Sequence, residues 1–211
     1  MAGLTLYGSP TCPLSQSVQM TLDLLKLSYT YIEMNTGVTC NYDFLAMNPH
    51  NTVPVLVDDS LVITESSAAM TYLVSQHRPS QLYPEQGAKK RSQIDQRLQF
   101  NIGRFYKSLT DCLDQGDDVE DDLIDDLKEV LMWVNQMTAG GYVLGTSITI
   151  ADLALVTTMT TLAACNLVTL HPYKNISTWL ENIKQAVPYF ENNCQKGAEE
   201  FGRLYKEKCE K

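Results

Sequence analysis

The feature that most constrains the fold of this chain is a short apolar strand that runs through a tight turn into an amphipathic helix. The strand is predicted at Leu4–Tyr7, the turn at Gly8–Cys12 and the helix at Pro13–Leu25. Proline suits the first helical position because its missing N–H has no partner there in any case. The pattern places Cys12 at the helix N-terminus, where unpaired N–H groups and the helix dipole stabilise an anion. We therefore predict thiolate chemistry at Cys12.

The composition excludes several kinds of partner. The 211 residues carry a formal net charge of -9, whereas nucleic acids and anionic membranes attract clustered Lys and Arg. The longest apolar stretch, Leu153–Leu170, contains five threonines and Asn166, so we expect a buried helix and no membrane span. No basic segment followed by an apolar run opens the chain, so we expect no signal peptide.

The cysteines and histidines point to a reducing compartment without a metal centre. The six cysteines form no C-x-x-C pair, and in the absence of a secretory signal we expect reduced thiols in a cytoplasmic protein. The three histidines lack the spacing of metal ligands, so no metal is assigned.

Strand and helix signals alternate as far as residue 77, and only helical signals follow. After the first helix we predict strands at Tyr29–Ile32, Val55–Val57 and Leu61–Ile63, and helices at Tyr42–Met47 and Ser66–Gln76. From residue 87 onward, apolar residues recur every three or four positions. The segment His77–Glu85, with two prolines, has the composition of an exposed linker. We predict an α/β domain over residues 1–77 and an all-helical domain over residues 87–211.

One helix start in the second half is sharply marked. Thr149 followed by Asp152 matches a capping box, and Ile148 and Leu153 occupy the positions of a hydrophobic staple. We predict a helix that begins at Ile150, with a purely structural role for the cap.

Two segments of the first domain carry groups suited to a peptide-like ligand. In Asn48–Leu56, a cis Val53–Pro54 bond would turn the main chain of Val53 towards an extended peptide, whereas base rates favour a trans bond. Glu65-Ser66-Ser67 either caps a helix or holds a ligand carboxylate on the helix N–H groups while Glu65 binds an ammonium. The residues alone leave both alternatives open.

The order of these motifs resembles that of the cytosolic glutathione transferases over nearly the whole chain. L-Y-G near the start, N-P-H-N-T-V-P-V-L-V-D-D, E-S-S-A, D-Q-R-L-Q-F-N-I-G and T-I-A-D-L-A-L-V-T-T are most similar to the insect delta and epsilon types. The resemblance implies a thioredoxin-like N-terminal domain, an all-α C-terminal domain and a homodimer. It also implies conjugation of glutathione, as co-substrate, to hydrophobic electrophiles in detoxification.

The resemblance further implies which residues form the site. Cys12 and Ser9 are the candidate catalytic residues. The glutathione-binding residues would be Cys12, His50, Asn51, Thr52, Val53, Pro54, Glu65, Ser66 and Ser67. The hydrophobic co-substrate would contact Leu14, Ile102, Arg104, Tyr106, Leu109, Phe201 and Tyr205. No metal, nucleic acid or membrane is implied as a partner.

The chain departs from the family pattern where the thiol is activated. Cys12 stands at the position where the insect types carry a serine, and Ser9 is the only nearby serine that can substitute. The positions of two family histidines and one family arginine read Asn51, Thr39 and Ser67.

These departures keep three functions open. A thiol is a weak hydrogen-bond donor, so Cys12 suits activation of glutathione less well than a hydroxyl does. An ionised Cys12 would instead attack a mixed disulfide, and its C-P-L context is similar to the C-P-[FY] start of omega-class transferases and glutaredoxins. The alternatives to conjugation are therefore an omega-like thiol transferase or dehydroascorbate reductase that uses Cys12, and a non-catalytic binder of apolar ligands.

Overall fold

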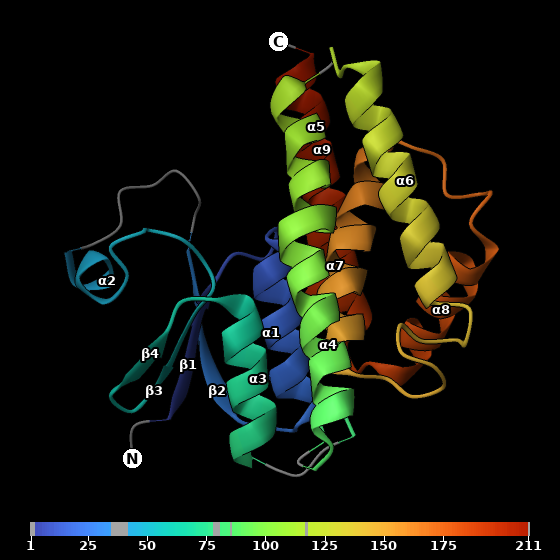
Figure 1. The fold of residues 1–211 in the computed structure, drawn as a ribbon. Coiled ribbons are helices and arrows are strands. Elements are labelled where there is room, and N and C mark those ends of the chain that lie inside the picture. Colours follow the sequence, from blue (N-terminus) through green and yellow to red (C-terminus); the bar gives the residue numbers. More distant parts are fainter. Residues whose placement is uncertain (1–2, 35–41, 78–80, 85, 117, 211) are drawn as a thin grey trace.

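The computed structural model of this chain describes residues 3–34, 42–77, 81–84, 86–116 and 118–210. A domain that contains all the named strands lies beside a larger helical domain (Figure 1). Thr39, where a family histidine is replaced, and Cys40 lie outside the described residues. The same holds for the linker positions Arg78, Pro79, Ser80 and Glu85.

The first domain has the order β1 (Leu4–Gly8), α1 (Pro13–Leu24), β2 (Tyr29–Glu33), α2 (Tyr42–Met47), β3 (Val55–Asp58), β4 (Leu61–Ile63) and α3 (Ser66–His77). Its four strands lie in the order β2-β1-β3-β4, with β1 parallel to β2 and the other pairs antiparallel. Helices α1 and α3 pack together on one side of the sheet, and α2 lies on the other (Figure 1). This is the predicted thioredoxin-like α/β domain.

Alternating burial explains why β1 forms the centre of this sheet. Leu4 and Leu6 are buried towards the helices, whereas Thr5 and Tyr7 are half-buried on the opposite face. The Tyr7 ring meets Phe44 of α2 with their centroids 5.5 Å apart. The alternation gives both faces of a central strand a partner, as its position between β2 and β3 requires.

The second domain contains only helices among its named elements. They are α4 (Ala88–Phe100), the π-helical segment η1 (Asn101–Tyr106), α5 (Lys107–Gln115), α6 (Asp121–Met137), α7 (Ile150–Cys165), α8 (Lys174–Ala186), the π-helical segment η2 (Glu191–Gln195) and α9 (Lys196–Cys209). All residues from Ile150 to Leu162 are buried. Helix α7 contacts α1, α4 and α9, so it joins the two domains as well as the helices of its own.

The predicted buried helix is confirmed at α7, and its threonines explain how polar residues fit inside the core. The hydroxyls of Thr157, Thr160 and Thr161 donate to carbonyl oxygens one turn earlier at 2.7–3.0 Å. Such bonds satisfy the hydroxyl without a partner from outside the helix. In the described part of the chain, no helix is both long and apolar enough to cross a bilayer.

The capping box at the start of α7 is confirmed and extends further than predicted. The Thr149 N–H and hydroxyl donate to Asp152 at 2.8 and 2.9 Å. The same carboxylate accepts from the Val143 N–H at 2.7 Å and from the Trp179 indole N–H at 3.0 Å. Asp152 is fully buried, so it ties the preceding loop and α8 to the helix start.

The prediction of an exposed linker is wrong for its central residues. Leu82 and Tyr83 are 7% and 5% exposed. The Tyr83 hydroxyl donates to Asp95 at 2.9 Å, and the Arg91 guanidinium lies 4.8 Å from the Tyr83 ring centroid. The prediction of exposure rested on Pro79 and Pro84. Leu82 and Tyr83, which lie between these prolines, pack against the helical domain instead.

Candidate active site

Cys12 lies at the N-cap of α1, as predicted, with Pro13 at the first helical position. Its N–H donates to the Ser9 carbonyl, and its carbonyl accepts from the Gln16 N–H, both at 3.0 Å. Within the described ranges, its half-buried thiol forms no capping hydrogen bond to the helix. The sulfur lies instead 3.9 Å from the Val53 carbonyl oxygen. The Cys12 thiol therefore lies at the start of α1 without capping its N–H groups.

The segment that meets Cys12 is held in place by a buried asparagine. Asn48 is fully buried, and its amide donates to the Thr52 carbonyl at 2.8 Å and to the Thr52 hydroxyl at 3.3 Å. Its side-chain oxygen accepts from the His50 N–H at 3.3 Å. The Val53–Pro54 bond is cis, which was one of the two alternatives left open by the sequence. Val53 is therefore presented to Cys12 by a preorganised loop.

The side chains of this loop differ in exposure. His50, Asn51 and Thr52 are exposed, Val53 is half-buried and Pro54 is buried. Asn51 has φ 54°, a left-handed conformation that asparagine tolerates better than most residues. The three residues before Val53 are therefore open to solvent, whereas the chain becomes buried at Pro54.

The third segment of the predicted glutathione site is the start of α3. Glu65 is exposed, Ser66 is 4% exposed and Ser67 is half-buried. The Glu65 carbonyl accepts from the Ala69 N–H at 2.9 Å, so the helical hydrogen bonds begin at Glu65. Helices α1 and α3 both start at the same end of the first domain (Figure 1). Two positive helix termini therefore flank this end of the sheet.

Ser9, the predicted substitute for the family serine, is engaged within the turn. It is 5% exposed, and its hydroxyl forms a 3.0 Å hydrogen bond with the hydroxyl of Thr11. Its N–H donates to the Ser15 hydroxyl at 3.2 Å. Ser9 thus holds the shape of the turn, and Cys12 is the more exposed of the two candidates.

Sequence reasoning missed the contact between this turn and the C-terminal helix. The Gln16 amide donates to the Pro10 carbonyl at 2.7 Å, and Gln16 is 1% exposed. Gly197, near the start of α9, packs so closely that an added Cβ would lie 1.9 Å from the Pro10 oxygen and 2.6 Å from the Gln16 amide nitrogen. A glycine inside a helix was the only signal of this close approach.

Two tyrosines share the electrostatic environment of Cys12. Burial raises the pKa of Tyr106 to about 12, with further contributions from the charges of Cys12 and Asp114. Burial also raises the pKa of Tyr31, and the charges of Glu33 and Cys12 add to the effect. Both phenols therefore remain protonated donors at neutral pH. Tyr106 was predicted in the site, whereas Tyr31 was not.

The Tyr31 side chain on β2 reaches towards Gly8 of β1, close to Ser15 of α1. Its buried hydroxyl has no hydrogen-bond partner within the part of the chain that the structure describes. An added Cβ at Gly8 would lie 3.1 Å from that hydroxyl oxygen and 3.1 Å from the Ser15 Cβ. Glycine at position 8 therefore makes room for the tyrosine.

The remaining predicted co-substrate residues divide between the helices. Leu14 is half-buried next to the Cys12 turn, Ile102 is half-buried on η1, Phe201 is half-buried on α9, and Leu109 is fully buried in the core. The π-helical turn at η1 changes which side chains share a face, and a 3.6-residue period does not reveal this.

Arg104 and Tyr205 are bound to other parts of the helical domain. The Arg104 guanidinium pairs with Asp126 and lies 3.6 Å from Glu129, both on α6, and 5.4 Å from the Trp133 ring centroid. The Tyr205 hydroxyl donates to the Gly116 carbonyl at 2.8 Å. Neither contact is with the Cys12 turn or with the Val53 loop.

The described residues contain no group of three or more His, Cys, Asp or Glu side chains arranged to hold a metal. The site offers one thiol, two helix N-termini and main-chain groups. Helix N-termini can bind an anion, and unpaired main-chain groups can bind an extended peptide.

The family is established by comparison with known proteins. Residues 6–81 match the N-terminal domain of glutathione S-transferase, and residues 75–188 match its C-terminal domain. The chain belongs to the glutathione S-transferase family.

Several relatives of the chain are insect glutathione transferases. The chain is 32% identical over 204 residues to glutathione S-transferase D7 of Drosophila melanogaster, covering 92% of this chain and 90% of that relative. The solved delta-class glutathione transferase of Nilaparvata lugens superposes with a TM-score of 0.91 at 30% identity, covering 97% of this chain and 99% of that one. A glutathione transferase homologue from Drosophila mojavensis with bound glutathione gives a TM-score of 0.88 at 32% identity, covering 99% and 98%. The predicted family and its insect homologues are confirmed.

Proposed function

We propose that this protein conjugates reduced glutathione to hydrophobic electrophiles, and that it acts in the cytoplasm, where thiols stay reduced. The observation that carries the proposal is the meeting of Cys12 at the start of α1 with the Val53 carbonyl, 3.9 Å away. The start of α3 lies at the same end of the domain. A related structure that holds glutathione supports the same ligand here.

The proposed binding mode assigns each part of the tripeptide to one segment. The main chain of the central cysteine pairs with Val53, because an extended peptide needs only main-chain partners. The carboxylate of the γ-glutamyl end meets the N–H groups at Ser66 and Ser67, and Glu65 receives its ammonium. His50, Asn51, Thr52 and Pro54 form the surrounding loop. None of these contacts needs the family histidines or arginine that the chain lacks.

In the proposed reaction the thiolate of glutathione attacks the electrophile at the start of α1. The thiol must lose its proton near pH 7, although its pKa is about 8.5 in solution. The positive end of α1 stabilises the anion. The phenol of Tyr106 is a protonated donor near Cys12 and would add a hydrogen bond that the weak thiol donor cannot supply.

We propose that the electrophile lies between the Cys12 turn and the helical domain. Leu14, Ile102, Tyr106 and Phe201 are the predicted contacts that keep a half-buried side chain available. Leu109 would support them from the core. Arg104 and Tyr205 would contribute only indirectly, because their polar groups are bound to α6 and to Gly116.

The role of Cys12 in place of a serine is the finer part of this proposal. The Cys12→Ser variant supplies the hydroxyl donor of the insect enzymes, so conjugation should rise and any transfer from a glutathione mixed disulfide should disappear. Cys12→Ala should also abolish thiol transfer but leave conjugation low. Purified variants would be assayed with a chloronitrobenzene electrophile and with a mixed disulfide, side by side.

The assay separates the three functions that the sequence left open. If wild-type protein reduces the mixed disulfide and does not conjugate, an omega-like thiol transferase is the better description. If it does neither but still gives a thermal shift with millimolar glutathione, the protein is a binder. If Cys12→Ala conjugates as well as wild type and Ser9→Ala does not, Ser9 activates the thiol.

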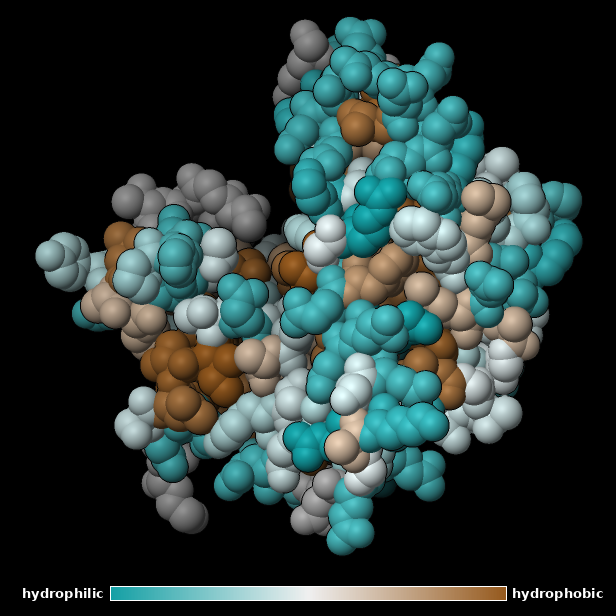
Figure 2. Space-filling view, viewed as in Figure 1, coloured by the Kyte–Doolittle hydropathy of each residue, from teal (hydrophilic) through white to brown (hydrophobic). Residues whose placement is uncertain are grey.

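We further propose a homodimer, as the family resemblance implies. Apolar side chains gather over the β3–β4 side of the first domain (Figure 2), and Leu61 on β4 is 43% exposed. An exposed strand edge with apolar side chains favours association with a partner surface. Sedimentation at low micromolar concentration should give a dimer, and a monomer alone would contradict the proposal.

A further inference from the structure

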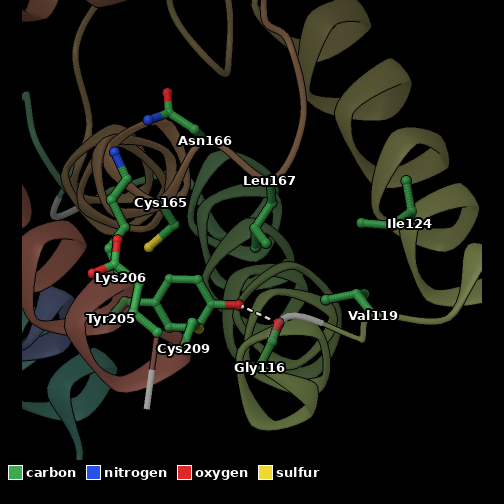
Figure 3. A pocket seen from close by; sticks show the side chains of 10 residues that line it. Gly116, Val119, Ile124, Cys165, Asn166, Leu167, Tyr205, Lys206 and Cys209 are labelled. Atoms are coloured by element: carbon green, nitrogen blue, oxygen red, sulfur yellow. Dashed lines mark hydrogen bonds between the residues drawn. The ribbon is translucent and has the colours of Figure 1, made fainter.

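A cavity lies at the C-terminal end of α9, beside the ends of α5 and α7 (Figure 3). It has a volume of about 390 Å³, within the range of small-molecule sites. Its walls come from the ends of several helices and include Val119, Ile124, Cys165, Leu167, Lys206 and Cys209. The hydrogen bond from Tyr205 to the Gly116 carbonyl, 2.8 Å long, fixes one wall.

This cavity is separate from the glutathione site. Gly197, at the second position of α9, contacts the Pro10 turn, whereas Cys209 is the last residue of the same helix. Twelve residues of helix correspond to about 18 Å along the axis. A molecule of ordinary substrate size in this cavity would therefore leave Cys12 free.

The chemistry of the cavity is set by two thiols on neighbouring helices. Cys165 ends α7 and is 5% exposed, whereas Cys209 on α9 is half-buried and thus more accessible. Burial and the neighbouring Cys209 raise the pKa of Cys165 to about 11, and Lys206 acts in the opposite direction. Cys165 therefore stays protonated, and Cys209 is the thiol that a reagent in the cavity can reach.

The remaining walls suit an apolar molecule with one polar end. Val119, Ile124 and Leu167 provide an apolar side, and Lys206 lies on the wall with the thiols, where Glu210 adds a carboxylate. A nucleophile beside an apolar wall and a cation is complementary to a carbonyl compound with a hydrocarbon substituent. The cation would stabilise the negative charge that develops on the carbonyl oxygen.

We propose that this cavity is a second binding site, in which Cys209 is covalently modified by α,β-unsaturated carbonyl compounds that carry an apolar group. The Cys209 sulfur forms a bond to the β carbon, and the electron pair of the carbon–carbon double bond moves towards the carbonyl oxygen. The proton lost by the thiol returns to the α carbon. The product is a thioether, with no net oxidation and no second reactant.

The test compares two maleimides that share the reactive group and differ in the apolar group. N-phenylmaleimide and N-methylmaleimide would be reacted with the Cys12→Ser variant and with N-acetylcysteine, and the rate at each cysteine followed by peptide mass spectrometry. The phenyl-to-methyl rate ratio at Cys209 should exceed that of N-acetylcysteine about tenfold, because the ring is buried against the apolar wall.

Two tryptophan variants make the test specific to the cavity. Leu167→Trp fills the cavity and should return the rate ratio at Cys209 to that of N-acetylcysteine. Leu204→Trp adds the same bulk at a 45% exposed position outside the lining and should leave the ratio unchanged. Thermal melting checks that both variants fold. A ratio equal to that of N-acetylcysteine in the Cys12→Ser parent, or one that Leu167→Trp does not lower, would overturn the proposal.

Discussion

The starts of α1 and α7 perform opposite tasks with the same kind of helix terminus. At α7 the Asp152 carboxylate accepts from four donors, and the junction is fully buried. At α1 the half-buried Cys12 thiol caps no helix N–H among the described residues and faces the Val53 carbonyl. A helix terminus closed by its own side chains contributes stability, whereas an open one keeps its positive end available to a ligand.

The largest expected change in stability comes from removing the side chain that caps the start of α7. Asp152→Ala leaves the buried N–H groups of Val143, Thr149 and Trp179 without an acceptor, so the free energy of unfolding should fall by at least about 3 kcal/mol. Urea denaturation measures the loss. Asp152→Asn keeps one acceptor oxygen and should lose less. Equal stability of the alanine variant and wild type would show that the closed terminus contributes nothing.

A smaller loss of stability is expected where α9 of the helical domain packs against the turn before α1. Gly197→Ala forces a Cβ against the Pro10 carbonyl, and overpacking of this kind costs about 1–3 kcal/mol. The change should also displace the Cys12 turn and weaken glutathione binding, as measured by calorimetry.

Gly202→Ala is the matched control for that variant. Its added Cβ would lie 2.5 Å from the Ala164 carbonyl on α7, so it should destabilise the helical packing without reaching the Cys12 turn. If both variants retain wild-type affinity for glutathione, the contact of Gly197 with the turn has no functional role.

The smallest effects test the two N-cap residues directly. Thr149→Ala should reduce the free energy of unfolding by about 1 kcal/mol, because it removes a capping hydroxyl. Cys12→Ala should change it by less than about 0.5 kcal/mol, because the thiol caps no N–H of its helix in the described structure. Chemical denaturation of the pair decides the matter, and a larger loss at Cys12 than at Thr149 would reverse the comparison.

Local sequence signals predicted the elements whose causes are local. The strand and helix around Cys12 follow from alternation and from Pro13, and the start of α7 follows from Thr149 and Asp152. Each of these signals lies within a few residues of the feature it predicts, so no knowledge of the tertiary fold is required.

Contacts between distant segments could not be predicted in this way. Nothing near Arg104 in sequence indicates its pairing with Asp126 on α6, and nothing near Tyr205 indicates its hydrogen bond to Gly116. The buried Tyr31 hydroxyl depends on space left by Gly8 on the neighbouring strand. Such features depend on tertiary packing. In a single sequence their only trace is a glycine or tyrosine whose role is not apparent.

The contact between Gly197 and the Pro10 turn has a consequence for hybrids made from two family members. Such a hybrid could take residues 1–77 from this chain and the helical domain from a relative. The exchange would fall between α3 and α4, so it would interrupt no helix or strand. Yet the geometry of the turn depends on Gly197, 187 residues after Pro10, where a side chain larger than hydrogen collides with the Pro10 oxygen. The hybrid should keep the geometry of the turn only when the helix α9 from the relative also carries glycine at that position.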